Sequence, residues 1–255
     1  MNKACFLILI FLFIQMIIHP PPVISHDTFS FMQEGDSLWG KREDLRMLKS
    51  SIDSYKKVLE IDKNNYEACW KIARSYFYIL DTLPESKEMK KRHKVLGNEG
   101  MIYAWSALEL NPQGVEGHYY YGLCVAEYTL GISLIKALTK GLASEFKNQM
   151  EESLKINKHY NSAGPLRALG RYWFRIPWPK RNLNKSIHYL KESVAFFPMN
   201  VRSRVYLAES YLKAGEKELA KEQLQKAVIL PSNLKEEAGA QRWKERANIL
   251  LRKKF

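Results

Sequence analysis

The sequence predicts an all-α protein: a right-handed α-solenoid of about four helical hairpins with insertions, plus a C-terminal capping helix. After residue 40, apolar residues recur at spacings of three and four, and no stretch alternates as a half-buried strand does. Five helices end in related phrases of a small residue, an apolar pair and a polar or proline stop. Such repetition is typical of stacked hairpins. The phrases end at Asp62, Pro112, Asn157, Pro198 and Pro231.

Residues 1–25 have the pattern of a secretory signal. Lys3 precedes the apolar run Cys5–Ile18, and three prolines and Ser25 follow. The run is shorter than the ~20 apolar residues that a membrane-spanning helix needs, so we expect a cleaved signal. An uncleaved anchor formed by residues 5–18 is the alternative. No lipid anchor is expected, because Cys5 begins the run and a lipoprotein signal has its cysteine at the end.

The rest of the chain divides into a linker, residues 26–40, and a helical repeat domain, residues 41–255. The first hairpin is interrupted by Pro84, the third contains Pro177 and Pro179, and Gly215 supports the turn of the last. The expected elements, in order, are a helix at about 41–61, a hairpin at 66–111 with an insertion near 82–84, a hairpin at 115–157 with an insertion at 130–142, a hairpin at 162–197 with the loop 176–180, a regular hairpin at 201–230, and a capping helix from Ser232 or Asn233 to Phe255.

The hairpin at 201–230 shows the repeat most clearly. The small residues Ala208, Ala220 and Ala227 allow two antiparallel helices to approach closely, and Tyr211 fills the gap between them. This pattern resembles the tetratricopeptide repeat (TPR), a 34-residue helix–turn–helix unit. The earlier hairpins share its ends but are longer in the middle, where a solenoid tolerates insertions.

Three stretches carry a closer resemblance: residues 104–112 (Ala-Trp-Ser-Ala-Leu-Glu-Leu-Asn-Pro), 118–122 (His-Tyr-Tyr-Tyr-Gly) and 164–171. They resemble a bacterial TPR group that includes the T-component proteins of TRAP (tripartite ATP-independent periplasmic) transport systems. The wide insertions, and Leu-Glu-Leu-Asn-Pro before a His-Tyr helix, are also similar to the regulator of microtubule dynamics family. The resemblance covers roughly residues 45–252 and implies a helical repeat fold without catalytic chemistry. It implies a periplasmic partner protein in the first case and an intracellular role in the second.

The sequence contains no motif for catalysis or metal binding. It lacks a Gly-x-x-x-x-Gly-Lys loop, a His-Glu-x-x-His or Cys-x-x-Cys pair and a Gly-x-Ser-x-Gly elbow, and its six histidines are scattered singly. We therefore expect a protein that is not an enzyme and has no cofactor and no metal. Cys69 and Cys124 are expected to be buried thiols in helices, with a disulfide as the alternative in an oxidising compartment.

The first helix of each hairpin in such a solenoid lines the concave face. The inward places on the helix at 163 include Arg167, Arg171 and Arg175, which form one row because they are four residues apart. Guanidinium groups suit carboxylates, and the formal net charge of +13 favours an anionic partner. The same count on neighbouring helices gives Arg202 and Glu209. The predicted ligand- or partner-binding residues are Trp70, Arg74, Tyr78, Tyr119, Glu127, Arg167, Arg171, Phe174, Arg175 and Trp178.

Each of these assignments has a structural alternative. In that alternative the arginines are solvated or paired with Glu116, Glu127 and Glu209 across adjacent helices. Tyr119 and its neighbours suit a hairpin core better than a binding surface. Trp178, between two prolines, either packs over a hairpin end or anchors a partner.

The predicted function is a protein-binding scaffold of the cell envelope, secreted or periplasmic, and an accessory subunit of a solute uptake system. The expected partner is another protein, an envelope or solute-binding component, with homo-oligomerisation open. One alternative is a solenoid that binds a small organic anion, such as a carboxylate, or a hydrophobic ligand; another is a membrane-anchored intracellular adaptor. The basic runs 87–94 and 252–254 are expected to be solvated, so no nucleic-acid partner is predicted.

Overall fold

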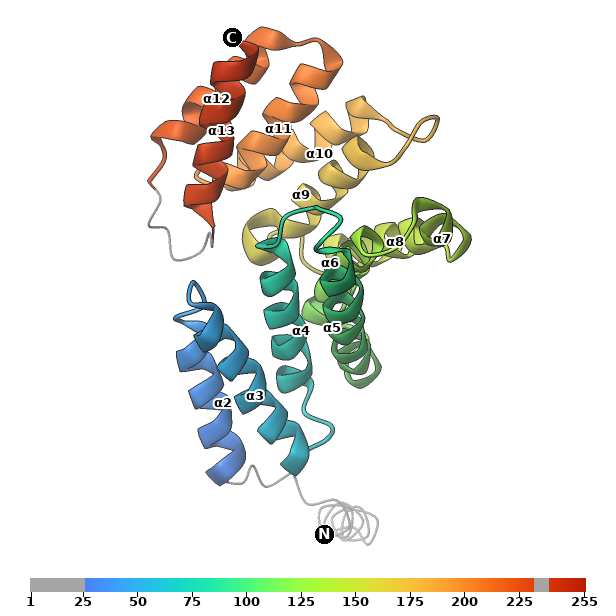
Figure 1. Ribbon diagram of the computed structural model, residues 1–255, viewed down its shortest axis with the longest axis vertical. Coiled ribbons are helices and arrows are strands. Elements are labelled where there is room, and N and C mark those ends of the chain that lie inside the picture. Colours follow the sequence, from blue (N-terminus) through green and yellow to red (C-terminus); the bar gives the residue numbers. More distant parts are fainter. Residues whose placement is uncertain (1–25, 232–238) are drawn as a thin grey trace, which may run out of the picture.

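A computed structural model describes residues 26–231 and 239–255. Within these ranges it contains helices and no strand, which confirms the all-α prediction. The helices are α2 (His26–Trp39), α3 (Leu45–Ile61), α4 (Tyr66–Asp81), α5 (Lys90–Leu110), α6 (Val115–Leu130), α7 (Leu134–Thr139), α8 (Leu142–Ile156), α9 (Tyr160–Arg175), α10 (Leu183–Phe196), α11 (Val201–Ala214), α12 (Lys217–Ile229) and α13 (Ala240–Lys254). They form a curved stack of helical hairpins with α13 at the C-terminal end (Figure 1).

The hairpins pair α2 with α3, α4 with α5, α6 with α8, α9 with α10 and α11 with α12. The first helices of neighbouring hairpins also contact each other, for example α4 and α6. The last helix, α13, packs on α12 and α11. The predicted TPR-like solenoid and its capping helix are therefore confirmed. Apolar side chains of α13 cover the last hairpin, where Ala247 and Leu250 join the cluster around Leu224.

Helix ends lie where the sequence supplies capping residues. The side chains of Asn65 and Asn200 accept hydrogen bonds from the backbone N–H of Ala68 (2.9 Å) and Ser203 (2.8 Å), at the starts of α4 and α11. Gly215 ends α11 with a φ of +91°, a left-handed conformation that costs glycine little. These caps mark the starts of α4 and α11 and the end of α11.

Residues 26–40, which the sequence predicts to be a linker, instead form α2 and the turn after it. Contacts with two later helices hold α2 in place. The hydroxyl of Tyr55 in α3 donates a hydrogen bond to Asp36 (2.8 Å), and Lys71 in α4 pairs with the same carboxylate (2.7 Å). The apolar pattern of α2 is weak, so its helix depends on partners that lie 19 and 35 residues away. With α2 in place, α3 belongs to a full hairpin, whereas the sequence predicts only a single helix at about 41–61.

The insertions occur where they were predicted. The chain is not helical between Asp81 and Lys90, the second insertion contains the short helix α7, and the third is the loop between Arg175 and Leu183. The predicted signal or anchor, residues 1–25, lies outside the described residues. The predicted start of the capping helix at Ser232 or Asn233 also lies outside them.

Aromatic side chains of α6 fill the central core, as their structural alternative predicts. Tyr119 and Tyr120 are buried and meet edge-to-face, with ring centroids 5.2 Å apart. Cys69 and Cys124 are buried free thiols, so no disulfide joins them. Burial raises the pKa of Cys69 to about 11, which keeps its thiol protonated at neutral pH.

Helices α5 and α6 approach each other closely at Gly97, where a Cβ atom would lie 2.8 Å from the backbone nitrogen of Tyr128. We expect Gly97→Ala to lower the free energy of unfolding by about 1–2 kcal/mol, because the clash outweighs alanine's better helix propensity. Urea unfolding followed by circular dichroism measures the change. Asn98→Ala, at the exposed neighbouring position of α5, is the control and should change stability by less than about 0.5 kcal/mol. Equal effects of the two substitutions would contradict close packing at Gly97.

Candidate functional site

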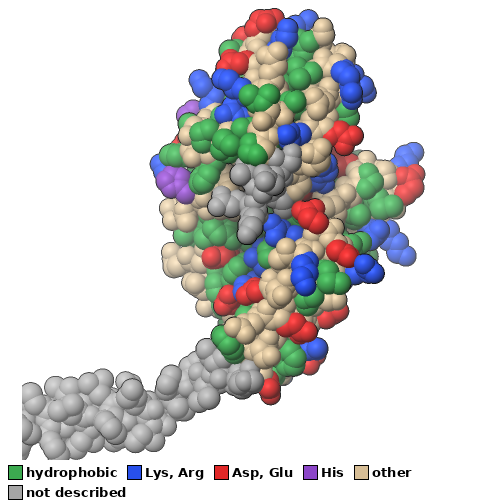
Figure 2. Space-filling model, turned by 90° about the vertical axis from the view of Figure 1, so that its left-hand side faces the viewer, with side chains coloured by type: hydrophobic (Ala, Val, Ile, Leu, Met, Phe, Trp, Pro, Cys, Tyr) green, Lys and Arg blue, Asp and Glu red, His purple; other side chains and the backbone are tan. Residues whose placement is uncertain are grey.

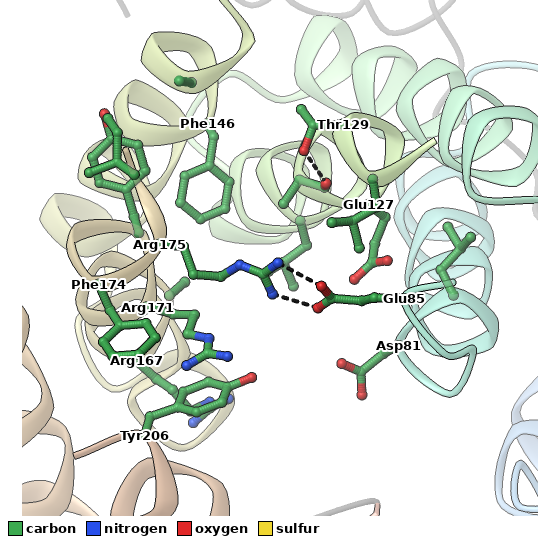
Figure 3. A pocket seen from close by; sticks show the side chains of 18 of the residues that line it. Asp81, Glu85, Glu127, Thr129, Phe146, Arg167, Arg171, Phe174, Arg175 and Tyr206 are labelled. Atoms are coloured by element: carbon green, nitrogen blue, oxygen red, sulfur yellow. Dashed lines mark hydrogen bonds and ion pairs between the residues drawn. The ribbon is translucent and has the colours of Figure 1, made fainter. Parts of the chain in front are cut away.

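The concave side of the solenoid contains a groove of about 1090 Å³. Its lining comes from α4 and the loop after it, from α5 to α9 and the loop after α9, and from α11 and α13. Arginines of α9 project from one wall, and Asp81, Glu85 and Glu127 project from the opposite wall (Figure 3). The groove therefore brings opposite charges from distant parts of the chain face to face.

Arg167, Arg171 and Arg175 stand in one row on α9, as their spacing predicts (Figure 3). Arg167 is only 8% exposed and donates hydrogen bonds to the backbone carbonyls of Ser162 (2.9 Å) and Asn161 (3.3 Å). Both of those residues have a positive φ, which is uncommon for residues other than glycine. Arg167 thus stabilises the bend at the start of α9.

The other two arginines pair with carboxylates. Arg171 donates to Glu209 of α11 (2.6 Å), and its guanidinium lies over the ring of Tyr206 (4.4 Å to the centroid). Arg175 donates two hydrogen bonds to Glu85, at 2.5 and 2.6 Å. This contact lowers the pKa of Glu85. The row is therefore paired within the protein, with Glu209 as predicted, but with Glu85 in place of Glu116 and Glu127.

Asp81, the last residue of α4, joins the two ends of the groove. It accepts hydrogen bonds from Arg202 at the start of α11 and from Arg242 of α13 (2.7 Å), which lie 121 and 161 residues further along the chain. Burial alone would raise the pKa of Asp81, but the two guanidinium groups lower it below its ordinary value. The carboxylate is therefore ionised at neutral pH, and it links α4 to the C-terminal hairpin.

A histidine and a glutamate form a second buried pair beneath the acidic wall. His93 Nδ1 lies 3.1 Å from Glu127 Oε2, within ion-pair distance but not aligned as a hydrogen bond. His93 Nε2 lies 3.4 Å from the carbonyl oxygen of Pro84. Only the protonated ring can donate from both nitrogens, and contact with Glu127 raises the pKa of His93. Burial raises the pKa of Glu127 despite the nearby histidine.

The remaining predicted site residues are dispersed. Tyr119 and Phe174 line the groove with Glu127, and Tyr119 accepts a hydrogen bond from the side chain of Asn161 (3.1 Å). Trp178 is 84% exposed and lies outside the groove lining. Its predicted role as a partner anchor stays a prediction.

Trp70, Arg74 and Tyr78 lie at the N-terminal end of the concave face. Trp70 stacks on Tyr120 (6.1 Å between centroids), so it belongs to the core. Arg74 and Tyr78 line a second, smaller pocket that adjoins the groove. The predicted residues thus divide between two neighbouring cavities, the core and an exposed loop.

Sequence reasoning missed Asp81, Glu85, His93, Arg242 and Arg246. Asp81 and Glu85 lie at a helix end and in an insertion, where the repeat pattern assigns no inward place. Arg242 and Arg246 lie on the capping helix, and Arg246 donates to Glu209 (2.9 Å). Their four-residue spacing on a helix that covers the last hairpin was the one available signal.

The part of the chain that the structure describes contains neither a group of metal-binding side chains nor a helix suited to crossing a membrane. No three of its His, Cys, Asp and Glu side chains are grouped so that they could hold a metal ion. None of its helices combines the length and the apolar character that crossing a membrane requires.

The sequence model of the family described as regulator of microtubule dynamics protein 1-3 matches residues 31–254. The chain belongs to this family. It is 22% identical over 197 residues to regulator of microtubule dynamics protein 1 of Pongo abelii, covering 71% of this chain and 60% of the relative. It is 25% identical over 189 residues to the Rattus norvegicus protein, covering 68% and 59%. The chain thus spans about 60% of the length of these relatives.

Solved structures support the fold. TTC0263, a TPR protein of Thermus thermophilus, superposes with a TM-score of 0.64 at 16% identity, covering 88% of this chain and all of that one. MamA of Desulfovibrio magneticus superposes with a TM-score of 0.54 at 12% identity, covering 80% and 94%. At such identities the likeness concerns the TPR-like architecture alone.

The predicted secreted or periplasmic location is wrong. The chain belongs to a family of regulators of microtubule dynamics, and microtubules are built inside eukaryotic cells. The prediction depended on the interpretation of residues 1–25 as a signal. These matches also give no support for a role in solute uptake or for an envelope or solute-binding partner.

Asp81→Asn is expected to lower the free energy of unfolding by about 2–3 kcal/mol. The substitution leaves Arg202 and Arg242 without their shared counter-charge, and the cost is moderated because the Arg242 side chain is 39% exposed. Urea unfolding measures it, with Asp53→Asn, an exposed position of α3, as the charge-matched control. In a double-mutant cycle, Arg202→Gln should cost less in the Asp81→Asn background than alone. Additive costs would contradict the interaction.

The buried His93–Glu127 pair should make the protein more stable at pH 6 than at pH 8. Both groups have a raised pKa, so the folded state holds protons that the unfolded state releases as the pH rises, and the stabilisation is lost above an ordinary histidine pKa of about 6.5. His93→Gln should flatten the dependence of the melting temperature on pH in this window. His188→Gln, at an exposed position of α10, should keep the wild-type slope. An unchanged slope in His93→Gln would show that the pair does not titrate as described.

Proposed function

We propose that this chain is a protein-binding scaffold that takes part in the regulation of microtubule dynamics, and that a partner segment binds in the concave groove. The groove carries the proposal, because it is a cavity shaped by helices from both halves of the chain on the face that a solenoid curves around a ligand. Family membership supports the microtubule connection. The expectation that the chain is not an enzyme accompanies this proposal and stays a prediction.

The charge of the groove favours an acidic partner segment. Eight basic side chains and four acidic ones line it, so an excess of positive charge remains after every acid is paired. On the face seen in Figure 2, basic and acidic side chains are interspersed instead of gathered by sign. The groove therefore offers a more selective attraction for an acidic chain than that surface does.

A small organic anion with an apolar part is a second candidate. Beyond the arginine row the groove is lined by Leu138, Leu142 and Phe146 of α7 and α8. A ligand whose charged group faces Arg171 would place an apolar chain against these residues. This candidate predicts that dodecanoate raises the melting temperature of the purified chain without any protein partner.

The test uses purified tubulin, whose assembly is followed by turbidity with and without the full chain. We expect the wild type to change the assembly rate and Lys213→Glu to weaken this effect severalfold. Lys213 is exposed, lines the groove and lies over the ring of Phe174 (4.8 Å), so its reversal changes the groove charge without breaking an ion pair of the arginine row. The effect should also weaken as salt is added.

Lys253→Glu is the matched control, since it makes the same change of charge at an exposed site near the C-terminus. It should behave as the wild type does. The proposal fails if the wild type leaves assembly unchanged, or if the two reversals weaken the effect equally.

A further inference from the structure

A second pocket of about 230 Å³ adjoins the groove at its N-terminal end. It lies between the turn after α2, the helix α4 and the starts of α9 and α11. It shares Phe77, Asp81, Arg167 and Arg202 with the groove, so the two cavities meet along one wall. An extended ligand in the groove could therefore place one group in this pocket.

The pocket is lined by four arginines and one acid. The arginines are Arg42, Arg74, Arg167 and Arg202, and the acid is Asp81. Asp81 already accepts hydrogen bonds from Arg202 and Arg242, so it has little capacity left to balance the others. Positive charge thus exceeds negative charge in a small, partly enclosed space, where anions are strongly attracted.

Arg74 is fixed in place, and no carboxylate of residues 26–231 or 239–255 pairs with it. Its guanidinium lies between the indole rings of Trp39 and Trp70, with the guanidinium carbon 3.8 Å and 4.9 Å from the two ring centroids. One terminal nitrogen donates a hydrogen bond to the hydroxyl of Tyr55 (3.3 Å). Its Nε is buried and has no hydrogen-bond partner among the described residues. The nearest acid in this network, Asp36, bonds to Tyr55 and is also paired with Lys71.

A buried N–H without an acceptor costs free energy unless a ligand supplies one. Stacking between two indoles keeps the planar guanidinium rigid, so little entropy is lost when its donors bind. The pocket is also lined by Asn200, whose side-chain oxygen caps α11. Such a concentration of fixed donors fits an anion with several oxygens.

We propose that this pocket binds a phosphate group, either as a free ion or on a phosphorylated side chain of a peptide that lies in the groove. Several guanidinium groups around one small cavity suit the multiple oxygens and double charge of phosphate better than a single carboxylate. The pocket lies in a concave wall, which favours an extended chain over a flat bilayer. Binding of the phosphate group rests on the second pocket alone, whereas its phosphopeptide form also rests on the proposed function of the groove.

Inorganic phosphate is the first probe, with sodium chloride at equal ionic strength as the reference. At about five times its dissociation constant, phosphate should raise the melting temperature of the wild-type chain by about 2–4 °C. Phosphate also stabilises folded proteins generally by its exclusion from their surfaces. Arg252→Gln, at an exposed position near the C-terminus, should therefore show the full wild-type shift, and Arg74→Gln should show the general effect alone.

Isothermal titration calorimetry then gives the affinity. Arg74→Gln should weaken phosphate binding about 10- to 100-fold, the loss expected for charge-assisted hydrogen bonds. Arg74→Lys keeps the charge between the two indoles but lacks the planar fork, so it should fold normally and bind with intermediate affinity.

O-phospho-L-serine binding, with no binding of L-serine, assigns the group to a phosphorylated chain, whereas binding of phosphate alone assigns it to the free ion. The proposal is overturned if Arg74→Gln and Arg74→Lys bind phosphate as the wild type does, or if chloride reproduces the shift.

Discussion

The carboxylate of Asp81 connects parts of the chain that stacking alone does not bring together. In a solenoid, each hairpin contacts its neighbours, and the ends of the stack are free to open or close around the concave face. Here α4 is tied directly to α11 and α13 through Arg202 and Arg242. The Glu85–Arg175 pair adds a second link across the same groove. The shape of the binding face therefore depends on a few ion pairs as well as on core packing.

The arginines that line the groove on α9 already have hydrogen-bond partners within the chain before any ligand binds. The three arginines of α9 all bond to groups of the chain itself, so a ligand must compete with these contacts or use the donors that remain. Internal pairing favours specificity and a fixed shape over raw affinity, because a paired guanidinium gains less from a new anion than an isolated one does. Arg74 differs from the row in this respect, since two indole rings hold it beside a cavity and no carboxylate in the described part of the chain pairs with it.

Much of the fold could be predicted from the sequence, because hairpin ends are local signals. The caps and phrases around Asp62, Asn111 and Asn157 mark turns that the structure confirms. Helix α2 was not predicted because the contacts that hold it, with Tyr55 and Lys71, are made with later helices and leave no local sequence signal. For the same reason the row of arginines and its partner Glu209 were predicted, but Glu85 was not, because a pair separated by 90 residues leaves no periodic pattern. The predicted secreted or periplasmic location was wrong because it was inferred from residues 1–25 and not from the repeat domain.

A distance measurement across the stack tests most directly whether ion pairs hold the groove in one shape. Nitroxide labels at Asn64→Cys, in the turn before α4, and Gln225→Cys, on α12, report the separation of the two halves by pulsed electron paramagnetic resonance. Both positions are exposed, Cys69 and Cys124 are buried, and Cys5→Ser removes the third native thiol. A narrow distribution in the labelled wild-type background that broadens with Asp81→Asn is the predicted result. Distributions of equal width with and without Asp81→Asn would contradict the account.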